Sequence, residues 1–371
     1  MRPALATGLL GITLIAAALL VDAEPLWVPG VALVALAVGC VAWVFVAASG
    51  VTVRRTLASP RIVENEPLSV ALEVRAGTLA LPTARLLDPL LSGPATLAPG
   101  RRGSRVRVEA RFARRGRRTL APTSVLIADP LGLAVREVRA RPAARDDELL
   151  VLPRIEPLAS AATGGDTSRL SSDARRLVGA EVELDGIRPL RDGTPASRIF
   201  WPAIARGAEP QERYLRADGD SRPLVVLDPR GADSDEELDA AVRAAASIAH
   251  ALARSGGCGV LLPGDRRPTD LEESLTGWTH VHARLALIGP ERGPSLAVVA
   301  TRRGPVVFVS ARRRLGLPQA LADGHGAARV LVVPGAIPER RAAFGVAGCS
   351  GYVTGGPRGR KPARSAAGGA A

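Results

Sequence analysis

The sequence predicts a membrane-anchored multidomain protein with two transmembrane helices, an all-β sandwich and a doubly wound α/β domain. Three observations predict this fold class. Two long apolar stretches without a charged residue open the chain. Short runs that alternate apolar and polar residues follow, and the last third holds continuous apolar runs separated by helical patterns. A chain of 371 residues is long enough for several such units.

Changes in composition place the boundaries of these units. The predicted segments are a two-helix transmembrane hairpin at 1–50, a β-sandwich at 51–153, a flexible connector at 154–184, an arginine-tryptophan block at 185–222, an α/β domain at 223–355 and a disordered basic tail at 356–371.

The opening hairpin is predicted from the length of its two apolar stretches. Residues 27–48 are 22 positions without a charge, and as a helix they span roughly 30 Å, the thickness of a hydrocarbon core. Residues 4–21 are shorter and also suit a signal peptide. However, only Arg2 precedes them, and the second stretch follows within five residues. We therefore expect both stretches to contact the lipid bilayer, through residues 4–48.

Charged residues beside the hairpin predict its orientation. Arg2 precedes the first stretch, Arg54 and Arg55 follow the second, and the short connection carries only Asp22 and Glu24. The positive-inside rule then places both ends, and the main body of the protein, in the cytoplasm. Two tryptophans near the ends of the second stretch suit interfacial anchors, namely Trp27 and Trp43.

Residues 51–153 carry the period of half-buried strands. The runs 68–76 and 104–112 alternate apolar and polar residues, and clusters of proline and glycine separate them. About five to seven short strands over such a length suggest an antiparallel sandwich of immunoglobulin-like kind. No histidine occurs before His250, and we interpret this segment as a spacer or docking module.

The chain is strongly basic, with a formal net charge of +13, and Lys361 is its only lysine. A basic surface suits nucleic acid or anionic lipid, but the arginines are spread along the chain and also fit the codon usage of a GC-rich genome. Aromatic residues make up only 3%, which leaves little to stack on bases. We expect no nucleic-acid partner. The basic tail is a weaker candidate for anionic lipid.

The block at 185–222 mixes arginines with aromatic residues. It reads as a recognition surface for a carboxylate-rich or phosphate-bearing partner, because guanidinium groups bind both. Alternatively, Ile199, Trp201 and Ile204 pack on the next domain while the arginines pair locally. The partner-binding candidates in this block are Arg188, Arg198, Trp201 and Arg206.

With these parts in this order, the chain resembles the bacterial membrane proteins grouped as domain-of-unknown-function 58. The β-rich region contributes the stretch 114–133 to the resemblance. In the block, Leu190 stands where that family usually has an aromatic residue, Thr194 replaces an aspartate, and Pro202 replaces a lysine. The matching positions are Arg188, Gly193, Arg198, Ile199, Trp201, Ala205 and Arg206.

The resemblance implies a location and partners. Such proteins lie in the bacterial inner membrane, end in a domain similar to von Willebrand factor A, and are encoded beside MoxR-type AAA+ ATPases. The resemblance thus implies a multi-pass membrane protein that acts with such an ATPase, or with other envelope proteins, in an envelope-related process.

The residues of 223–355 support an α/β domain independently of the resemblance. The continuous apolar run 223–228 is typical of a strand buried on both faces. Ser234 and Glu237 have the spacing of a capping box, and the helix that they begin ends at Gly256. Further apolar runs predict strands in the same sheet, at 258–262, 305–310 and 328–334.

The end of the first strand is the candidate ligand site, because ligands of such sheets bind beyond the carboxyl ends of the strands. The resemblance implies a metal ion held there by an Asp-x-Ser-x-Ser motif. In this chain Asp228 is present, but Arg230 and Ala232 replace the two serines. A guanidinium repels a cation and a methyl group offers no lone pair. We therefore expect a degenerate site without a metal or cofactor, in which Asp228 shapes the turn or pairs with an arginine.

Motifs for other chemistry are missing. A P-loop needs a lysine, and the sequence has none before residue 361. No His-Glu-x-x-His, Cys-x-x-Cys or Gly-x-Ser-x-Gly motif occurs either. His280 and His282 alternate by two, which predicts a strand with both on one solvated face. The cysteines make no disulfide framework, and Cys258 and Cys349 are expected to be small core residues.

The sequence therefore predicts a non-enzymatic, membrane-anchored adaptor or scaffold, with Arg230 as a further partner-binding candidate. The alternative is a metal-dependent ligand binder or hydrolase that uses Asp228, Asp265 and Ser310 at the strand ends.

Overall fold

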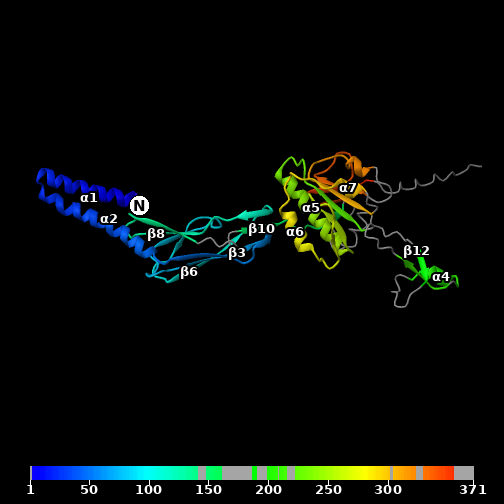
Figure 1. Ribbon diagram of the computed structural model, residues 1–371, viewed down its shortest axis with the longest axis horizontal. Coiled ribbons are helices and arrows are strands. Elements are labelled where there is room, and N and C mark those ends of the chain that lie inside the picture. The colour runs from blue at the N-terminus through cyan, green and yellow to red at the C-terminus, as the bar shows by residue number, and fades with distance from the viewer. Residues whose placement is uncertain are drawn as a thin grey trace, which may run out of the picture. The chain divides into compact units, whose positions relative to one another are not determined.

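The computed structural model describes most of the chain and divides it into two compact units, residues 1–151 and 152–371 (Figure 1). The predicted connector beyond residue 160 and the predicted tail at 356–371 lie outside the described residues. The described residues are 2–140, 148–160, 186–189, 199–207, 209–214, 222–300, 304–322 and 329–354.

The chain opens with two apolar helices, α1 (Arg2–Val21) and α2 (Trp27–Ala48), joined by the short 3₁₀ turn η1 (Glu24–Leu26). The two helices pack closely because they meet at glycines. A Cβ atom added at Gly11 would lie 2.7 Å from the carbonyl oxygen of Gly30. By length and composition both helices are able to cross a membrane, and near the N-terminus a signal sequence has the same character. The predicted pair of apolar helices is confirmed.

Antiparallel sheets make up the rest of the first unit, as predicted. One sheet has the strand order β1-β3-β6, a second β2-β10-β7 and a third β5-β4-β8-β9. The strands are β1 (Thr52–Leu57), β2 (Arg61–Val63), β3 (Leu68–Arg75), β4 (Ala84–Leu87), β5 (Ala95–Leu97), β6 (Gly103–Ala110), β7 (Gly116–Thr119), β8 (Ser124–Ala128), β9 (Val135–Arg139) and β10 (Glu148–Leu152).

One apolar core joins these sheets. Alternate residues of β3 are buried, such as Val70 and Leu72, and they share a cluster with Val125 and Ile127 of β8. The cluster also holds Ala47, Ala48 and Val51 at the C-terminal end of α2. The helix end is therefore part of the core of the β-rich region.

A buried ion pair lies within this core. Arg55 Nη1 is 3.2 Å from Asp88 Oδ2, and the two side chains are 2% and 0% exposed. The same Nη1 donates to the carbonyl oxygen of Ala121, and Thr123 donates its hydroxyl to Asp88. Arg55, which the sequence places among the arginines that flank the hairpin, is therefore turned into the protein, whereas Arg54 is exposed.

The second unit contains a mixed sheet with the strand order β11-β19-β20-β18-β17-β14-β15-β16. Its four central strands β18, β17, β14 and β15 are parallel, and the strands at both edges are antiparallel, so the sheet is not wholly parallel. The strands are β11 (Ala159–Ser160), β14 (Leu224–Asp228), β15 (Cys258–Leu261), β16 (Thr269–Leu271), β17 (Val306–Ser310), β18 (Arg329–Pro334), β19 (Phe344–Val346) and β20 (Cys349–Thr354).

Helices cover both faces of this sheet. The long helix α5 (Asp235–Arg254) and α6 (Trp278–Ala286) pack on one face. The short helices α7 (Leu296–Ala300) and α8 (Gln319–Ala322) pack on the other. The predicted α/β organisation is confirmed, although the edges of the sheet are mixed.

Two predictions about local structure meet different outcomes in these helices. The predicted cap at Ser234 is present, since Glu237 N donates to Ser234 Oγ at 3.2 Å. The predicted strand with His280 and His282 on one solvated face is wrong. Both residues lie in α6, where positions two apart point in different directions, so His282 is buried and His280 exposed.

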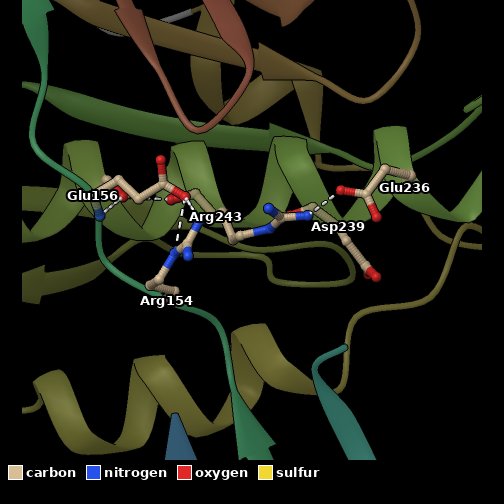
Figure 2. A network of polar contacts seen from close by, with 6 residues as sticks. Arg154, Glu156, Glu236, Asp239 and Arg243 are labelled. Carbon is tan, nitrogen blue, oxygen red and sulfur yellow. Dashed lines mark hydrogen bonds and ion pairs between the residues drawn. The ribbon is translucent and has the colours of Figure 1, made fainter. Parts of the chain in front are cut away.

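Residues 152–160 pack on the second unit, whereas the sequence predicts an exposed connector from Arg154. Glu156 N donates to Ser247 Oγ of α5 at 2.8 Å, and Leu158 joins the apolar core beneath this helix. Figure 2 shows Arg154 bonded to Glu156 beside α5, and Arg243 of the same helix bonded to Glu236. Arg243 Nη2 and Glu236 Oε1 are 2.5 Å apart.

Candidate functional site at the strand ends

The carboxyl ends of β14 and β17 lie side by side at a topological switch point. Asp228 and Ser310, the last residues of the two strands, are register partners. The strand that follows β14 in the sequence, β15, lies on one side of it, whereas β17 and then β18 continue the sheet on the other side. Such a point leaves the strand ends open between the connections, which is where α/β sheets bind ligands.

Arg230 binds both oxygens of Asp228 at this point. Arg230 Nε donates to Asp228 Oδ1 at 2.9 Å, and Nη2 donates to Oδ2 at 3.1 Å. The Arg230 amide also donates to Oδ1, at 3.3 Å, so the carboxylate orders the turn as well. The hydrogen bond and the charge of Asp228 raise the pKa of Arg230 above its usual range. Asp228 therefore has both of the roles expected for it: it shapes the turn, and it pairs with an arginine.

The pair is buried on one side and open on the other. The Asp228 side chain is 8% exposed, whereas that of Arg230 is 50% exposed. Gly293 leaves room for the guanidinium, because a Cβ atom there would lie 2.3 Å from Arg230 Cζ. Nothing in the sequence around Gly293 points to this role, which depends on a contact between residues 63 positions apart.

The other two oxygen groups considered for a metal are also engaged by the chain itself. Asp265 accepts two hydrogen bonds from Arg284, at 2.6 and 3.0 Å. Ser310 Oγ donates to the carbonyl oxygen of Arg312 and accepts from its amide. In the part of the chain that the structure describes, no group of three or more His, Cys, Asp or Glu is placed to share a metal ion.

Further arginines stand at the same edge. Arg312 follows Ser310 directly, and its side chain passes beside Gly231, where a Cβ atom would lie 3.1 Å from Arg312 Cδ. Arg313 is 3.9 Å from Glu237. We call Arg230, Arg312 and Arg313 the strand-end rim. The run of three arginines after the strand at 306–310 is the sequence signal for this rim, and the metal-motif interpretation does not include it.

Chemically, the strand-end rim is suited to oxygen acceptors. All three of its side chains are exposed and carry a permanent charge. Guanidinium groups bind carboxylates and phosphates through paired N–H groups.

The candidates of the arginine-tryptophan block stand on a separate small element. A two-stranded sheet of β12 (Gly186–Pro189) and β13 (Gln211–Tyr214) flanks the short helix α4 (Trp201–Ala205). Arg188 is the register partner of Glu212, Arg206 is exposed at the end of α4, and Arg198 lies outside the described residues. Trp201 is 57% and Ile204 39% exposed. The interpretation that they pack on the next domain stays a prediction.

The burial of Cys258 and Cys349, the cysteines of the second unit, makes both thiols unreactive. Cys258 and Cys349 are buried, and this burial raises the pKa of both thiols to about 12. A nucleophilic cysteine needs its thiolate form near neutral pH. Both side chains belong to the apolar core under α5.

The sequence matches no protein-family model, and no curated protein shows significant similarity to it. The resemblance to the domain-of-unknown-function 58 family therefore stays a prediction.

Proposed function

We propose that this protein is a non-enzymatic, membrane-anchored adaptor whose strand-end rim binds an acidic segment of a partner protein. The observation that carries the proposal is the ion pair at the switch point. Arg230 is held on Asp228 by two hydrogen bonds and keeps half of its side chain exposed. A fixed cation at this position is suited to a carboxylate from outside.

The geometry of the pair favours binding by a partner. A guanidinium has five N–H donors, and Asp228 uses only those on Nε and Nη2. The bidentate contact fixes the plane of the guanidinium, so less conformational entropy is lost when a second acceptor binds. Arg312 beside it adds a second exposed positive charge, which favours an acidic segment over a single carboxylate.

The remaining parts support a scaffold at the membrane. The two apolar helices are suited to anchor the chain in the bilayer, and the flanking Arg2 and Arg54 favour a cytoplasmic body. We infer that the antiparallel region is an immunoglobulin-like spacer and that the second unit is a von Willebrand factor A-like binding domain. The resemblance stated above makes a MoxR-type AAA+ ATPase, acting in an envelope-related process, the first partner to test.

Co-purification from the membranes of the native organism tests the proposal. We expect the wild-type chain to recover an ATPase or another envelope protein, and Arg230→Ser to reduce recovery about tenfold or more, since it removes a charge-assisted contact. Arg254→Ser is the matched control, because Arg254 is exposed at the opposite end of α5. Equal recovery by all three chains, or recovery of no partner, contradicts the proposal.

A further inference from the structure

The connection between β8 and β9 forms a tight tip that packs against α2. Asp129, at its base, is 4% exposed and accepts hydrogen bonds from the amides of Leu131 and Ala134. The Asp129 amide donates to the carbonyl oxygen of Ala134, and the Gly132 amide donates to that of Asp129. Most amides of the tip therefore have partners within the tip itself.

The tip is also bonded to the first helix. The amide of Ala4, in the first turn of α1, donates to the carbonyl oxygen of Leu133 at 3.0 Å. Ala134 shares a small apolar cluster with Ala4, Cys40 and Val44. These contacts fix the tip beside the end of the hairpin where α1 begins.

Contacts between the two helices give the depth of the tip along the hairpin. Gly8 faces Ala37, with 3.5 Å between an added Cβ and that of Ala37. Because the two helices are antiparallel, counting six residues from this contact places Arg2 of α1 opposite Trp43 of α2. The first charged residue and an aromatic anchor therefore lie at the same depth along the hairpin. Cys40 is three residues inside this level, about 4.5 Å along the helix axis, and Ala35 is about 12 Å inside it.

The tip and α2 enclose an apolar groove on the inner side of that level. The groove has a volume of about 380 Å³. Its lining includes Ala35, Cys40 and Trp43 of α2 and Pro130 and Leu131 of the tip. Leu131 at the end of the tip is 61% exposed. The groove is apolar, lies on the membrane side of Arg2 and has an exposed leucine beside it. Such a surface is suited to contact with lipid rather than with water.

We propose that the tip, residues 130–133, inserts into the bilayer beside the hairpin and that lipid acyl chains cover the groove. The inference rests on the membrane anchoring in the proposed function. Insertion requires that backbone polar groups have partners, and the bonds of Asp129 supply them. On the water side of the tip, Arg136 lies over the ring of Phe45 at 4.1 Å.

Depth-dependent fluorescence quenching of the full chain in phosphatidylcholine liposomes tests this inference. Leu131→Cys is labelled with a nitrobenzoxadiazole dye, and the unsubstituted chain serves as the labelling blank because its three cysteines are buried. Leu10→Cys, on the exposed face of α1, is the control for deep insertion. Thr119→Cys, on the exposed side of β7, is the control for the aqueous phase.

We expect lipids with a nitroxide near the carbonyl end of the acyl chain to quench the label at position 131, and iodide in the water to leave it unaffected. A nitroxide deeper in the chain should quench position 10, and iodide should quench position 119. If iodide quenches position 131 while position 10 stays protected, the tip does not insert and the anchor still holds. If iodide quenches positions 10 and 131 alike, the membrane anchor itself is wrong.

Discussion

Arg230 stands two residues after Asp228, and this spacing lets one side chain return to the end of its own strand. The carboxylate is thereby neutralised by the chain itself. A hydroxyl at position 230 would leave Asp228 with free lone pairs beside Ser310, which is a hard-oxygen environment of the kind that Mg²⁺ prefers. We therefore expect the identity of residue 230, together with that of residue 232, to decide between an anion site and a cation site.

Replacing the two residues that differ from the metal motif tests this at residue scale. We expect Arg230→Ser combined with Ala232→Ser to bind Mg²⁺ with a Kd of about 1 mM, because oxygen ligands replace a repelling charge. Calorimetry on the full chain in detergent measures the binding heat, with Arg254→Ser as the control variant. Binding of Mg²⁺ to the wild-type chain with equal affinity would show that Arg230 does not block the site.

At the scale of elements, helices α5 and α6 bring two histidines against one tryptophan. His282 stacks on Trp278 with ring centroids 4.9 Å apart, and His250 of α5 meets the same ring edge-on at 5.2 Å. His282 Nε2 lies 2.8 Å from the carbonyl oxygen of Pro153, which ties residues 152–160 to this helix. Burial lowers the pKa of both histidines.

A lowered histidine pKa predicts that acid destabilises the second unit. Below the ordinary pKa of about 6.5 the unfolded chain binds more protons than the folded chain, so stability is complete above that pH and falls as the pH drops toward the folded pKa values. We expect His282→Gln, which retains a donor for Pro153, to weaken this pH dependence. Thermal unfolding of the full chain in detergent at pH 5 and pH 7.5 measures it. His280→Gln is the control, since His280 is exposed, and it should unfold like the wild-type chain at both pH values.

The sequence predicted elements where one period persists over many residues, and it failed where a few residues or distant contacts decide. The 20 residues of α5 carry a helical period from Leu238 onward and a capping serine, so both the helix and its start could be predicted. In contrast, α6 has only nine residues, and the alternation of His280 and His282 agrees with a strand as well as with a helix. The contact of Gly293 with Arg230 depends on tertiary packing, which no local pattern contains.

At the scale of the whole molecule, the joint between the hairpin and the β-rich region is unusually close-packed. Gly77 lies against Ser49 and Gly50, and a Cβ atom there would lie 1.8 Å from the carbonyl oxygen of Ser49. Ser49 and Thr78 share a hydrogen bond between their hydroxyl groups at 3.0 Å. Backbone therefore meets backbone at this joint, and no flexible side chain is available to move aside.

A methyl group added at Gly77 should push the hairpin and the β-rich region apart. We expect Gly77→Ala to lower the free energy of unfolding by about 2 kcal/mol or more, because the added carbon overlaps backbone atoms. Denaturant unfolding of the full chain in detergent measures it. Gly93→Ala is the matched control, since an added Cβ there has nothing within 4 Å and should change stability by less than about 0.5 kcal/mol. Equal stability of the two variants would mean that the joint is loose.

The close joint has a mechanical consequence. The last turn of α2 is buried in the β core, and only Ser49, Gly50 and Val51 separate it from β1. No flexible linker therefore lies between the helix and the β-rich region. Any tilt or rotation of the hairpin must then turn the β-rich region by the same angle. A partner protein that tilts the two helices in the membrane would therefore change the orientation of the β-rich region as well.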